Sequence, residues 1–143
     1  MPNYVPLDDF DGIVASLSLF ELSREEPGVM AGRWFQWLQP NGCLLIYVFG
    51  ADDVKTSPEM WDSDRLCARR IEWKFMSRTI YMTLFTKAGW NGLLEKAGFS
   101  IGHTATDGFA PAGEANDDEP HYFVTGRKAG VALDGRGRDG VEG

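Results

Sequence analysis

The 143 residues include 14 Lys and Arg against 21 Asp and Glu, and the net charge of −7 argues against nucleic acid or an anionic membrane as a partner. Hydrophobic residues make up 43% of the chain, enough for the core of one domain, and no apolar run approaches the roughly 18 residues of a membrane span. Cys43 and Cys67 lack disulfide-scaffold or metal-site spacing, and the N-terminus lacks a signal-peptide pattern. We therefore expect an intracellular, cytoplasmic protein without a metal site.

The first predicted element is a strand at residues 11–17. Its almost uninterrupted apolar run is typical of a strand covered on both faces of a parallel sheet. Ser23 and Glu26 have the spacing of a capping box, in which the two side chains bond free backbone N–H groups at a helix start. We expect that helix to end at residues 40–42, where Pro, Asn and Gly turn the chain. Its apolar stripe consists of Met30, Trp34, Trp37 and Leu38.

Residues 43–49 form a second apolar run, in which Cys43 is expected as a small core residue. The resulting strand–helix–strand order predicts one parallel, right-handed unit. Residues 50–58 are typical of a loop, and residues 62–70 are predicted to be helical. Residues 71–85 are rich in aromatic residues and Met, which favours a flap over the core or the wall of a pocket.

A further helix is predicted after Thr86, and Gly98 supplies the left-handed residue that ends it, with Phe99 folding back on Leu94. Residues 99–106 and 121–127 are predicted strands, and the loop between them makes an antiparallel pair. The buried face of the helix consists of Trp90, Leu93, Leu94 and Ala97.

The last part of the chain differs from the rest in composition. Residues 129–143 contain five glycines and no aromatic residue, so we expect a disordered tail. The predicted organisation is therefore one α/β domain over residues 1–128 followed by that tail.

Four segments carry a resemblance to a known family. They are Phe10-Asp-Gly-Ile-Val with Ser16-Leu-Ser-Leu-Phe-Glu-Leu22, Leu38-Gln-Pro-Asn-Gly-Cys-Leu-Leu-Ile46, Gly89-Trp-Asn-Gly-Leu-Leu-Glu-Lys-Ala-Gly-Phe99 and His121-Tyr-Phe-Val-Thr-Gly-Arg-Lys128. In this order and spacing they resemble the C-terminal half of class I S-adenosylmethionine-dependent methyltransferases. The resemblance implies a partial Rossmann-like sheet with strand order 4-5-7-6, the last strand antiparallel, and helices packed on it.

The resemblance also points to features that this sequence lacks. In the family, a glycine-rich loop after the first strand and an acidic residue after the second hold S-adenosylmethionine, in the manner of dinucleotide sites. No such loop follows a predicted strand here, and the family's first three strands would lie before Met1. Only an adenine-side wall at Ser16 and Leu17 is implied. We therefore expect no cofactor and no tight binding of S-adenosylmethionine.

Without the family's first three strands, the strand at residues 11–17 becomes an edge of the sheet. Long apolar edges aggregate unless something covers them. We expect a homodimer in which this strand pairs antiparallel with its own copy, giving a continuous eight-stranded sheet. The alternatives are coverage by residues 71–85 or by a partner chain that supplies the missing half.

The resemblance implies an acceptor side without a cofactor cradle. The first hypothesis is therefore a repurposed protein that binds or converts a small apolar molecule, by isomerisation or cyclisation, without S-adenosylmethionine. The alternatives are a non-catalytic subunit that stabilises a partner, a methyltransferase active only as an oligomer, and an inactive remnant. The candidate catalytic groups are Glu21, Tyr47, His103 and His121, the two histidines being expected as neighbours on the terminal strands. The candidate substrate-binding walls are Trp61, Trp73, Phe75, Met76, Tyr81 and Met82.

Overall fold

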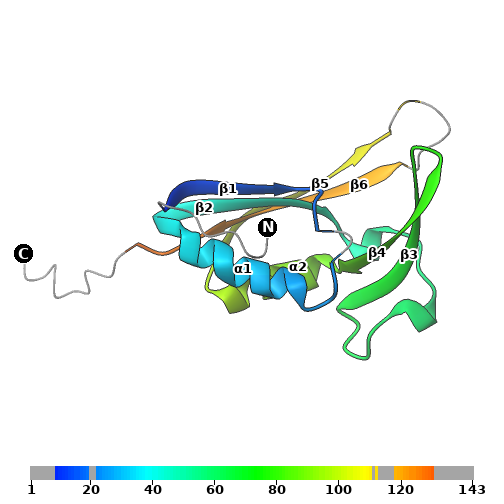
Figure 1. Ribbon diagram of the computed structural model, residues 1–143, viewed down its shortest axis with the longest axis horizontal. Helices are drawn as coiled ribbons and strands as arrows, with labels where there is room; N and C mark the ends of the chain where they lie inside the picture. The colour runs from blue at the N-terminus through cyan, green and yellow to red at the C-terminus, as the bar shows by residue number, and fades with distance from the viewer. Residues whose placement is uncertain (1–8, 20–21, 111, 113–117, 131–143) are drawn as a thin grey trace, which may run out of the picture.

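The computed structural model describes residues 9–19, 22–110, 112 and 118–130 (Figure 1). Glu21 and most of the predicted tail lie outside these residues. The helices and strands are β1 (Phe10–Ser16), α1 (Glu26–Trp37), β2 (Leu38–Phe49), the short 3₁₀ helices η1 (Ala51–Asp53) and η2 (Pro58–Met60), β3 (Cys67–Phe75), β4 (Arg78–Phe85), α2 (Lys87–Ala97), β5 (Ser100–Phe109) and β6 (Glu119–Arg127).

The main sheet has the strand order β1-β2-β6-β5. β1 runs parallel to β2, and β6 runs antiparallel to both of its neighbours, β2 and β5. This arrangement confirms the predicted α/β class and the predicted order 4-5-7-6 with an antiparallel final strand. The chain therefore has a partial Rossmann-like sheet, in which β1 forms one edge.

Both α-helices lie on the same face of this sheet and contact each other (Figure 1). Trp34 of α1 and the residues Trp90 and Leu94 of α2 are almost completely buried against the β2 side chains that face them. The indole N–H of Trp90 donates to the carbonyl of Phe49 at 3.0 Å, which fixes α2 to the end of β2. The predicted stripes of both helices thus form the main core.

The ends of α2 follow the sequence prediction in detail. The Thr86 hydroxyl accepts from the backbone N–H of Gly89 at 2.9 Å, as an N-cap does. Gly98 has a φ of 115°, a left-handed conformation that a residue with a Cβ rarely adopts. The backbone N–H of Phe99 then donates to the carbonyl of Leu94 at 3.1 Å, completing the stop motif.

The opposite face of the sheet carries no helix among the described residues. Strand register places Val14 beside Leu45 and Tyr47 opposite Phe123 on this side. Val14 is 67% exposed, whereas the other three side chains are partly buried. We call Val14, Leu45, Tyr47 and Phe123 the open face.

The predicted helix at residues 62–70 is wrong. A short turn precedes β3, which begins at Cys67 and pairs antiparallel with β4 as a separate two-stranded hairpin. The reason is long-range, because Arg24 binds Asp62 and Asp64 at this turn and residues from Cys67 onward pair with β4. Residues 71–85 therefore form most of a hairpin, which packs against the end of β2 through a second core of Phe49, Ala51, Ala68, Ile71, Met82 and Leu84.

The prediction that Cys43 is a small core residue is wrong, and it is Cys67 that is buried. Cys43 is exposed, because β2 already begins at Leu38 and the side chain of Cys43 points to the side without helices. Cys67 is fully buried, and burial raises the pKa of its thiol to about 11. Cys67 is therefore protonated and unreactive at neutral pH.

Other boundaries shift by a few residues. The carboxylate of Glu26 accepts from the backbone N–H of Ser23 at 2.7 Å, one half of the predicted capping box, and α1 begins at Glu26. The residues 40–42 that were expected to turn the chain continue within β2, where Asn41 adopts a φ of 71°. The predicted loop at residues 107–120 is shorter, since β5 continues to Phe109 and β6 starts at Glu119.

Candidate functional site

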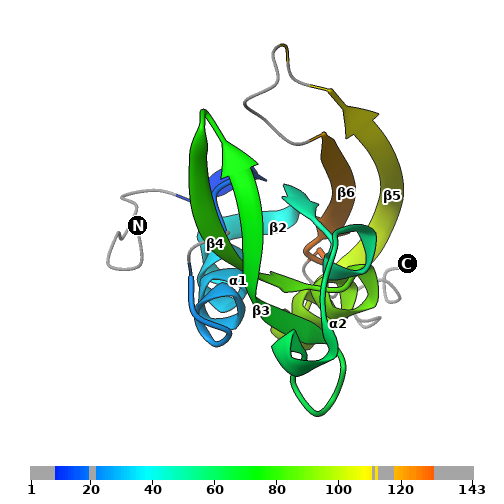
Figure 2. The same ribbon diagram turned by 90° about the vertical axis from the view of Figure 1, so that its right-hand side faces the viewer.

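A cleft of about 620 Å³ lies between the hairpin and the end of the main sheet. One wall comes from Glu72 and Trp73 of β3, and the opposite wall from residues at the paired ends of β5 and β6. Figure 2 shows the hairpin of β3 and β4 across from the ends of β5 and β6. Residues 53–55, which follow β2, also line the cleft. The full lining is Asp53, Val54, Lys55, Glu72, Trp73, Gly108, Phe109, Ala110, Asp118, Glu119 and Pro120.

The hairpin is held in place by aromatic packing at the end of β2. The ring of Trp73 lies against Phe49 with ring centroids 5.0 Å apart. Phe49 is 2% exposed and belongs to the second core, together with Ile71 and Met82 from the hairpin. Because this contact is buried, Trp73 is a fixed wall of the cleft.

A chain of hydrogen bonds connects the cleft with the open face. The hydroxyl of Tyr47 lies 2.5 Å from Nδ1 of His121, and Nε2 of His121 lies 2.7 Å from a carboxylate oxygen of Glu119. An ionised carboxylate only accepts hydrogen bonds, so in the neutral ring Nε2 carries the proton and Nδ1 accepts from Tyr47. Tyr47, His121 and Glu119 thus form an ordered donor–acceptor chain, which we call the Tyr–His–Glu chain.

The surroundings of this chain are apolar. The ring of His121 is stacked between Phe49 and Phe109, with centroid distances of 5.8 and 5.9 Å. The His121 side chain is 7% exposed and the Glu119 side chain 11%. Burial raises the pKa of Tyr47, and the negative charges of Glu119 and Asp107 add to the effect. The phenol therefore stays protonated and remains a hydrogen-bond donor.

The walls of the cleft combine aromatic rings with an excess of negative charge. Trp73 and Phe109 supply the rings. The Asp53 carboxylate is bound by Nζ of Lys87 at 2.7 Å, so it contributes little net charge. The remaining charged groups of the lining are Glu72, Asp118 and Glu119 against Lys55.

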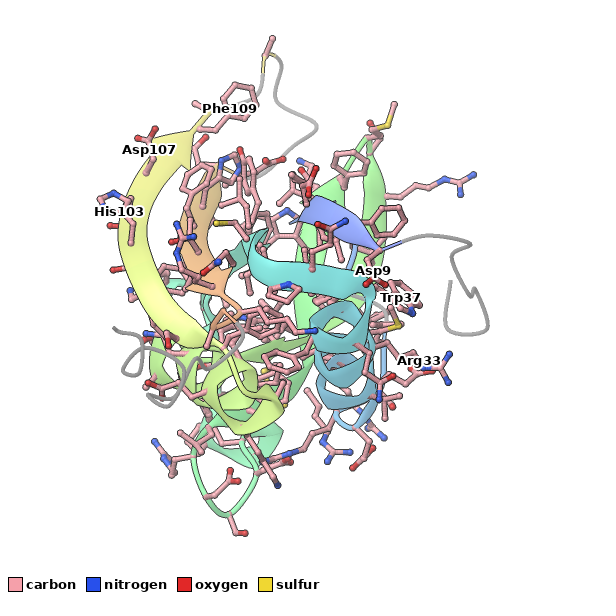
Figure 3. All side chains as sticks on the ribbon, turned by 90° about the vertical axis from the view of Figure 1, so that its left-hand side faces the viewer. Asp9, Arg33, Trp37, His103, Asp107 and Phe109 are labelled. Atoms are coloured by element: carbon pink, nitrogen blue, oxygen red, sulfur yellow. The ribbon has the colours of Figure 1, made fainter. Side chains whose placement is uncertain are left out.

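The structure brings together only some of the predicted catalytic residues. Tyr47 and His121 are in contact, whereas His103 is exposed on the outer strand β5 and points away from the cleft (Figure 3). The backbone N–H of His103 donates to the Thr125 hydroxyl at 2.7 Å, and its ring takes no part in the Tyr–His–Glu chain. Glu21 lies outside the described residues.

Of the six predicted wall residues, Trp73 alone lines the cleft. Met82 is in the second core at 1% exposure. Trp61 donates its indole N–H to Thr56 at 3.1 Å, near the base of the hairpin. Phe75, Met76 and Tyr81 are exposed along the hairpin.

Sequence reasoning missed Glu119 and Phe109, because both fell in a predicted loop. A usable signal was present in Glu119-Pro120-His121, since residues i and i+2 of a strand point to the same face. A predicted strand that begins at Glu119 would place the Glu119 carboxylate beside the imidazole of His121.

The resemblance implied an adenine-side wall at Ser16 and Leu17, and both residues are described. Ser16 is exposed, and Leu17 packs against the second core with a φ of 49°. Gly50 follows β2, but a Cβ there would lie 2.7 Å from an oxygen of Asp52, so the space beside this glycine is filled by the protein itself. Within residues 9–19, 22–110, 112 and 118–130, no group of three or more His, Cys, Asp or Glu side chains is placed to hold a metal ion.

No protein-family model matches this sequence, and no curated protein matches it. Solved structures do match the fold. A methyltransferase from Methanosarcina mazei, described as dependent on S-adenosylmethionine, gives a TM-score of 0.67 at 15% identity, with 92% of this chain and 66% of that chain covered.

Two further structures are similar. The 1,6-didemethyltoxoflavin N1-methyltransferase of Burkholderia thailandensis, solved with 1,6-didemethyltoxoflavin and S-adenosylhomocysteine, gives a TM-score of 0.58 at 19% identity, covering 90% of this chain and 48% of that one. A glycopeptide N-methyltransferase solved with S-adenosylmethionine gives a TM-score of 0.59 at 16% identity, covering 90% and 58%.

These similarities show the fold. The chain has a methyltransferase-like α/β fold and spans about half to two thirds of the length of the structures it resembles. None of the helices in the described part of the chain is long and apolar enough to cross a membrane.

Proposed function

We propose that this protein binds a small organic molecule in the cleft between the hairpin and the sheet, without using S-adenosylmethionine. The observation that carries the proposal is the cleft itself, about 620 Å³ with Trp73 and Phe109 on its walls and with the carboxylate of Glu119 held by a hydrogen bond from His121. Small-molecule sites are concave, are lined mostly by apolar groups, and contain a few well-placed polar atoms. The Burkholderia enzyme of the same fold holds a small heterocycle, 1,6-didemethyltoxoflavin.

Glu119 gives the cleft a chemical capability beyond binding. One of its oxygens accepts from His121, and in the part of the chain that the structure describes the second oxygen has no hydrogen-bond partner. A carboxylate held this way accepts a proton or a hydrogen bond from a ligand, the step that an isomerisation or cyclisation needs from a general base. We therefore also propose that the protein converts the molecule that it binds in this cleft.

The proposal is tested by ligand-observed NMR with a panel of small aromatic acids, amines and neutral compounds. We expect saturation transfer to at least one class of compound in the wild type and its loss in Trp73→Ala. Trp61→Ala is the matched control, because Trp61 does not line the cleft. No saturation transfer to any compound, or equal transfer in both variants, would refute binding at this site.

A second candidate function, assembly through β1, is favoured by the exposure of the sheet edge. β1 is paired on one side only in the described residues, and Val14 is 67% exposed. We propose that β1 pairs antiparallel with β1 of a second copy, centred on Ile13. In that register Asp11, the single charged residue of the strand, faces Ala15 of the other copy instead of a like charge.

The oligomeric state tests this second candidate. We expect sedimentation velocity at micromolar concentration to give a dimer, and Val14→Lys to give a monomer, since charges on edge strands prevent pairing. A wild-type monomer of 15.9 kDa would contradict the proposed dimer. If the protein is instead recovered as a heterodimer with a second polypeptide, β1 pairs with that partner chain and not with a second copy of itself.

A further inference from the structure

The charged side chains that line the cleft differ in burial and in hydrogen bonding. Glu72 and Asp118 are exposed carboxylates, and Lys55 is an exposed ammonium group. Glu119 differs, because its side chain is 11% exposed and receives a hydrogen bond from His121. It is therefore the one carboxylate of this lining that combines burial with a fixed orientation.

Among the described residues, no Lys or Arg forms an ion pair with Glu119, whose hydrogen-bond partner is the imidazole of His121. In the neutral form, His121 contributes a dipole and no charge, and the Tyr47 hydroxyl at the far end of the chain keeps the imidazole in the tautomer that donates to Glu119. Phe109 is paired with Glu119 across β5 and β6 and stacks on His121, so its ring lies near the carboxylate. Trp73 provides a second ring on the opposite wall of the cleft.

A partly buried carboxylate between two aromatic walls selects for positive charge. Aromatic faces attract cations through the ring quadrupole, with Trp the strongest, and quaternary ammonium ligands are recognised in this way. The carboxylate has lost much of its hydration, and a cation restores the electrostatic stabilisation that water would have given. A neutral molecule of the same shape gains the apolar contacts alone.

We propose that the cleft is a site for a small organic cation, with the ammonium group against Glu119 between Trp73 and Phe109. This inference rests on the proposed function, because it specifies the ligand of the same cleft. Glu119, Trp73 and Phe109 contact the ligand. His121 and Tyr47 are positioning residues, which act by holding the carboxylate.

The test is isothermal titration with choline and with its neutral isostere 3,3-dimethylbutan-1-ol, on the full chain. We expect choline to bind about tenfold or more tightly than the alcohol, and the difference to shrink as salt is added. Glu119→Gln is expected to abolish this preference while leaving the binding of the alcohol within about twofold. Trp73→Leu is expected to weaken choline more than the alcohol.

Tyr47→Phe tests the positioning role. It is expected to reduce the choline-to-alcohol preference about threefold, without changing the binding of the alcohol, a result that a general loss of structure would not give. Glu95→Gln is the control, since Glu95 is an exposed residue of α2 outside the cleft. Circular dichroism identifies any variant that has not folded. If Glu119→Gln does not fold, the cation site is still tested by the salt dependence of choline binding and by Trp73→Leu.

The outcomes separate the two levels of the proposal. If choline and the alcohol bind equally in the wild type, the cation site is refuted and a small-molecule cleft remains. If neither probe binds, the cation site is refuted, and the compound panel decides separately whether the cleft binds any small molecule. If Glu119→Gln retains the preference for choline, the assignment to Glu119 is wrong.

Discussion

Replacing Tyr47 with Phe removes one hydroxyl and leaves the rest of the side chain in place. The ring keeps its contact with Phe123, whose centroid is 4.3 Å away. The loss falls on Nδ1 of His121, a buried acceptor whose hydrogen bond comes from this hydroxyl. Leaving a buried polar atom unsatisfied costs about 1–3 kcal/mol, so we expect the free energy of unfolding to fall by that amount.

A double-mutant cycle makes the prediction specific to the chain of hydrogen bonds. His121→Phe fits between the same two rings but deprives the buried Glu119 of its donor, so it is expected to cost more than Tyr47→Phe. Once His121 is absent, the hydroxyl of Tyr47 has no acceptor to satisfy, and removing it adds little. We expect the two costs to be non-additive by about 1 kcal/mol or more.

Urea unfolding at neutral pH, followed by tryptophan fluorescence and far-ultraviolet circular dichroism, measures both quantities. For a chain of this size, each kcal/mol also lowers the melting temperature by about 3–5 °C. The reasoning is refuted if Tyr47→Phe stays within about 0.5 kcal/mol of the wild type, the range of a neutral surface substitution, or if the costs are additive.

Three further predictions concern the hairpin, the response to acid and the cofactor. Met76 and Ser77 form the hairpin turn with φ values of 51° and 62°, so Met76→Asn with Ser77→Gly should raise the free energy of unfolding by about 1–2 kcal/mol in urea titrations, and an unchanged midpoint would contradict the strain. The pKa of Asp62 is lowered by hydrogen bonds from Arg69 and Arg24. Because the folded pKa lies below the unfolded one, this stabilisation is present above the ordinary pKa near 3.8 and is lost as the pH falls through the folded value. Arg24→Ala should therefore have a lower free energy of unfolding than the wild type at pH 7, and the difference should shrink in acid. A difference that grows in acid would contradict the stabilising role of the Arg24–Asp62 pair. Finally, isothermal titration with S-adenosylmethionine is expected to show no micromolar binding, and a micromolar dissociation constant would overturn the proposal of a cofactor-independent protein.

The main sheet was predictable from the sequence because its signals are local and strong. Residues 43–49 form a continuous apolar run that is typical of a buried strand. The helix between Thr86 and Gly98 has an N-cap residue, an apolar face at helical spacing and a C-terminal glycine. The strand order came from the resemblance, since periodicity does not say which strands pair. The structure agrees on both points.

The hairpin and its charged base were not predictable in the same way. Residues 62–70 contain no proline or glycine, so local propensity permits a helix. What decides against it is a set of long-range contacts, in which Arg24 binds Asp62 and Asp64 from a different part of the chain. Such ion pairs join residues about 40 positions apart and leave no periodic trace in the sequence.

The candidate site was half predictable for a related reason. Tyr47 and His121 were chosen as isolated polar groups on apolar strands, and antiparallel pairing of β2 with β6 puts them next to each other. His103 has the same chemistry but lies on β5, the outermost strand, where its side chain is exposed. The difference between the two histidines depends on sheet position, which the sequence pattern around each does not encode.

The central claim is that the cleft between the hairpin and the sheet is the binding site. The most direct measurement is a titration of the ¹⁵N-labelled protein with choline, followed in two-dimensional NMR spectra. The account predicts shifts of the Trp73 indole signal and of the backbone signals of Gly108, Phe109 and Glu119, with α1 and α2 unchanged. Shifts confined to the helices would contradict the claim, as would the absence of shifts with choline and with every compound of the small-molecule panel.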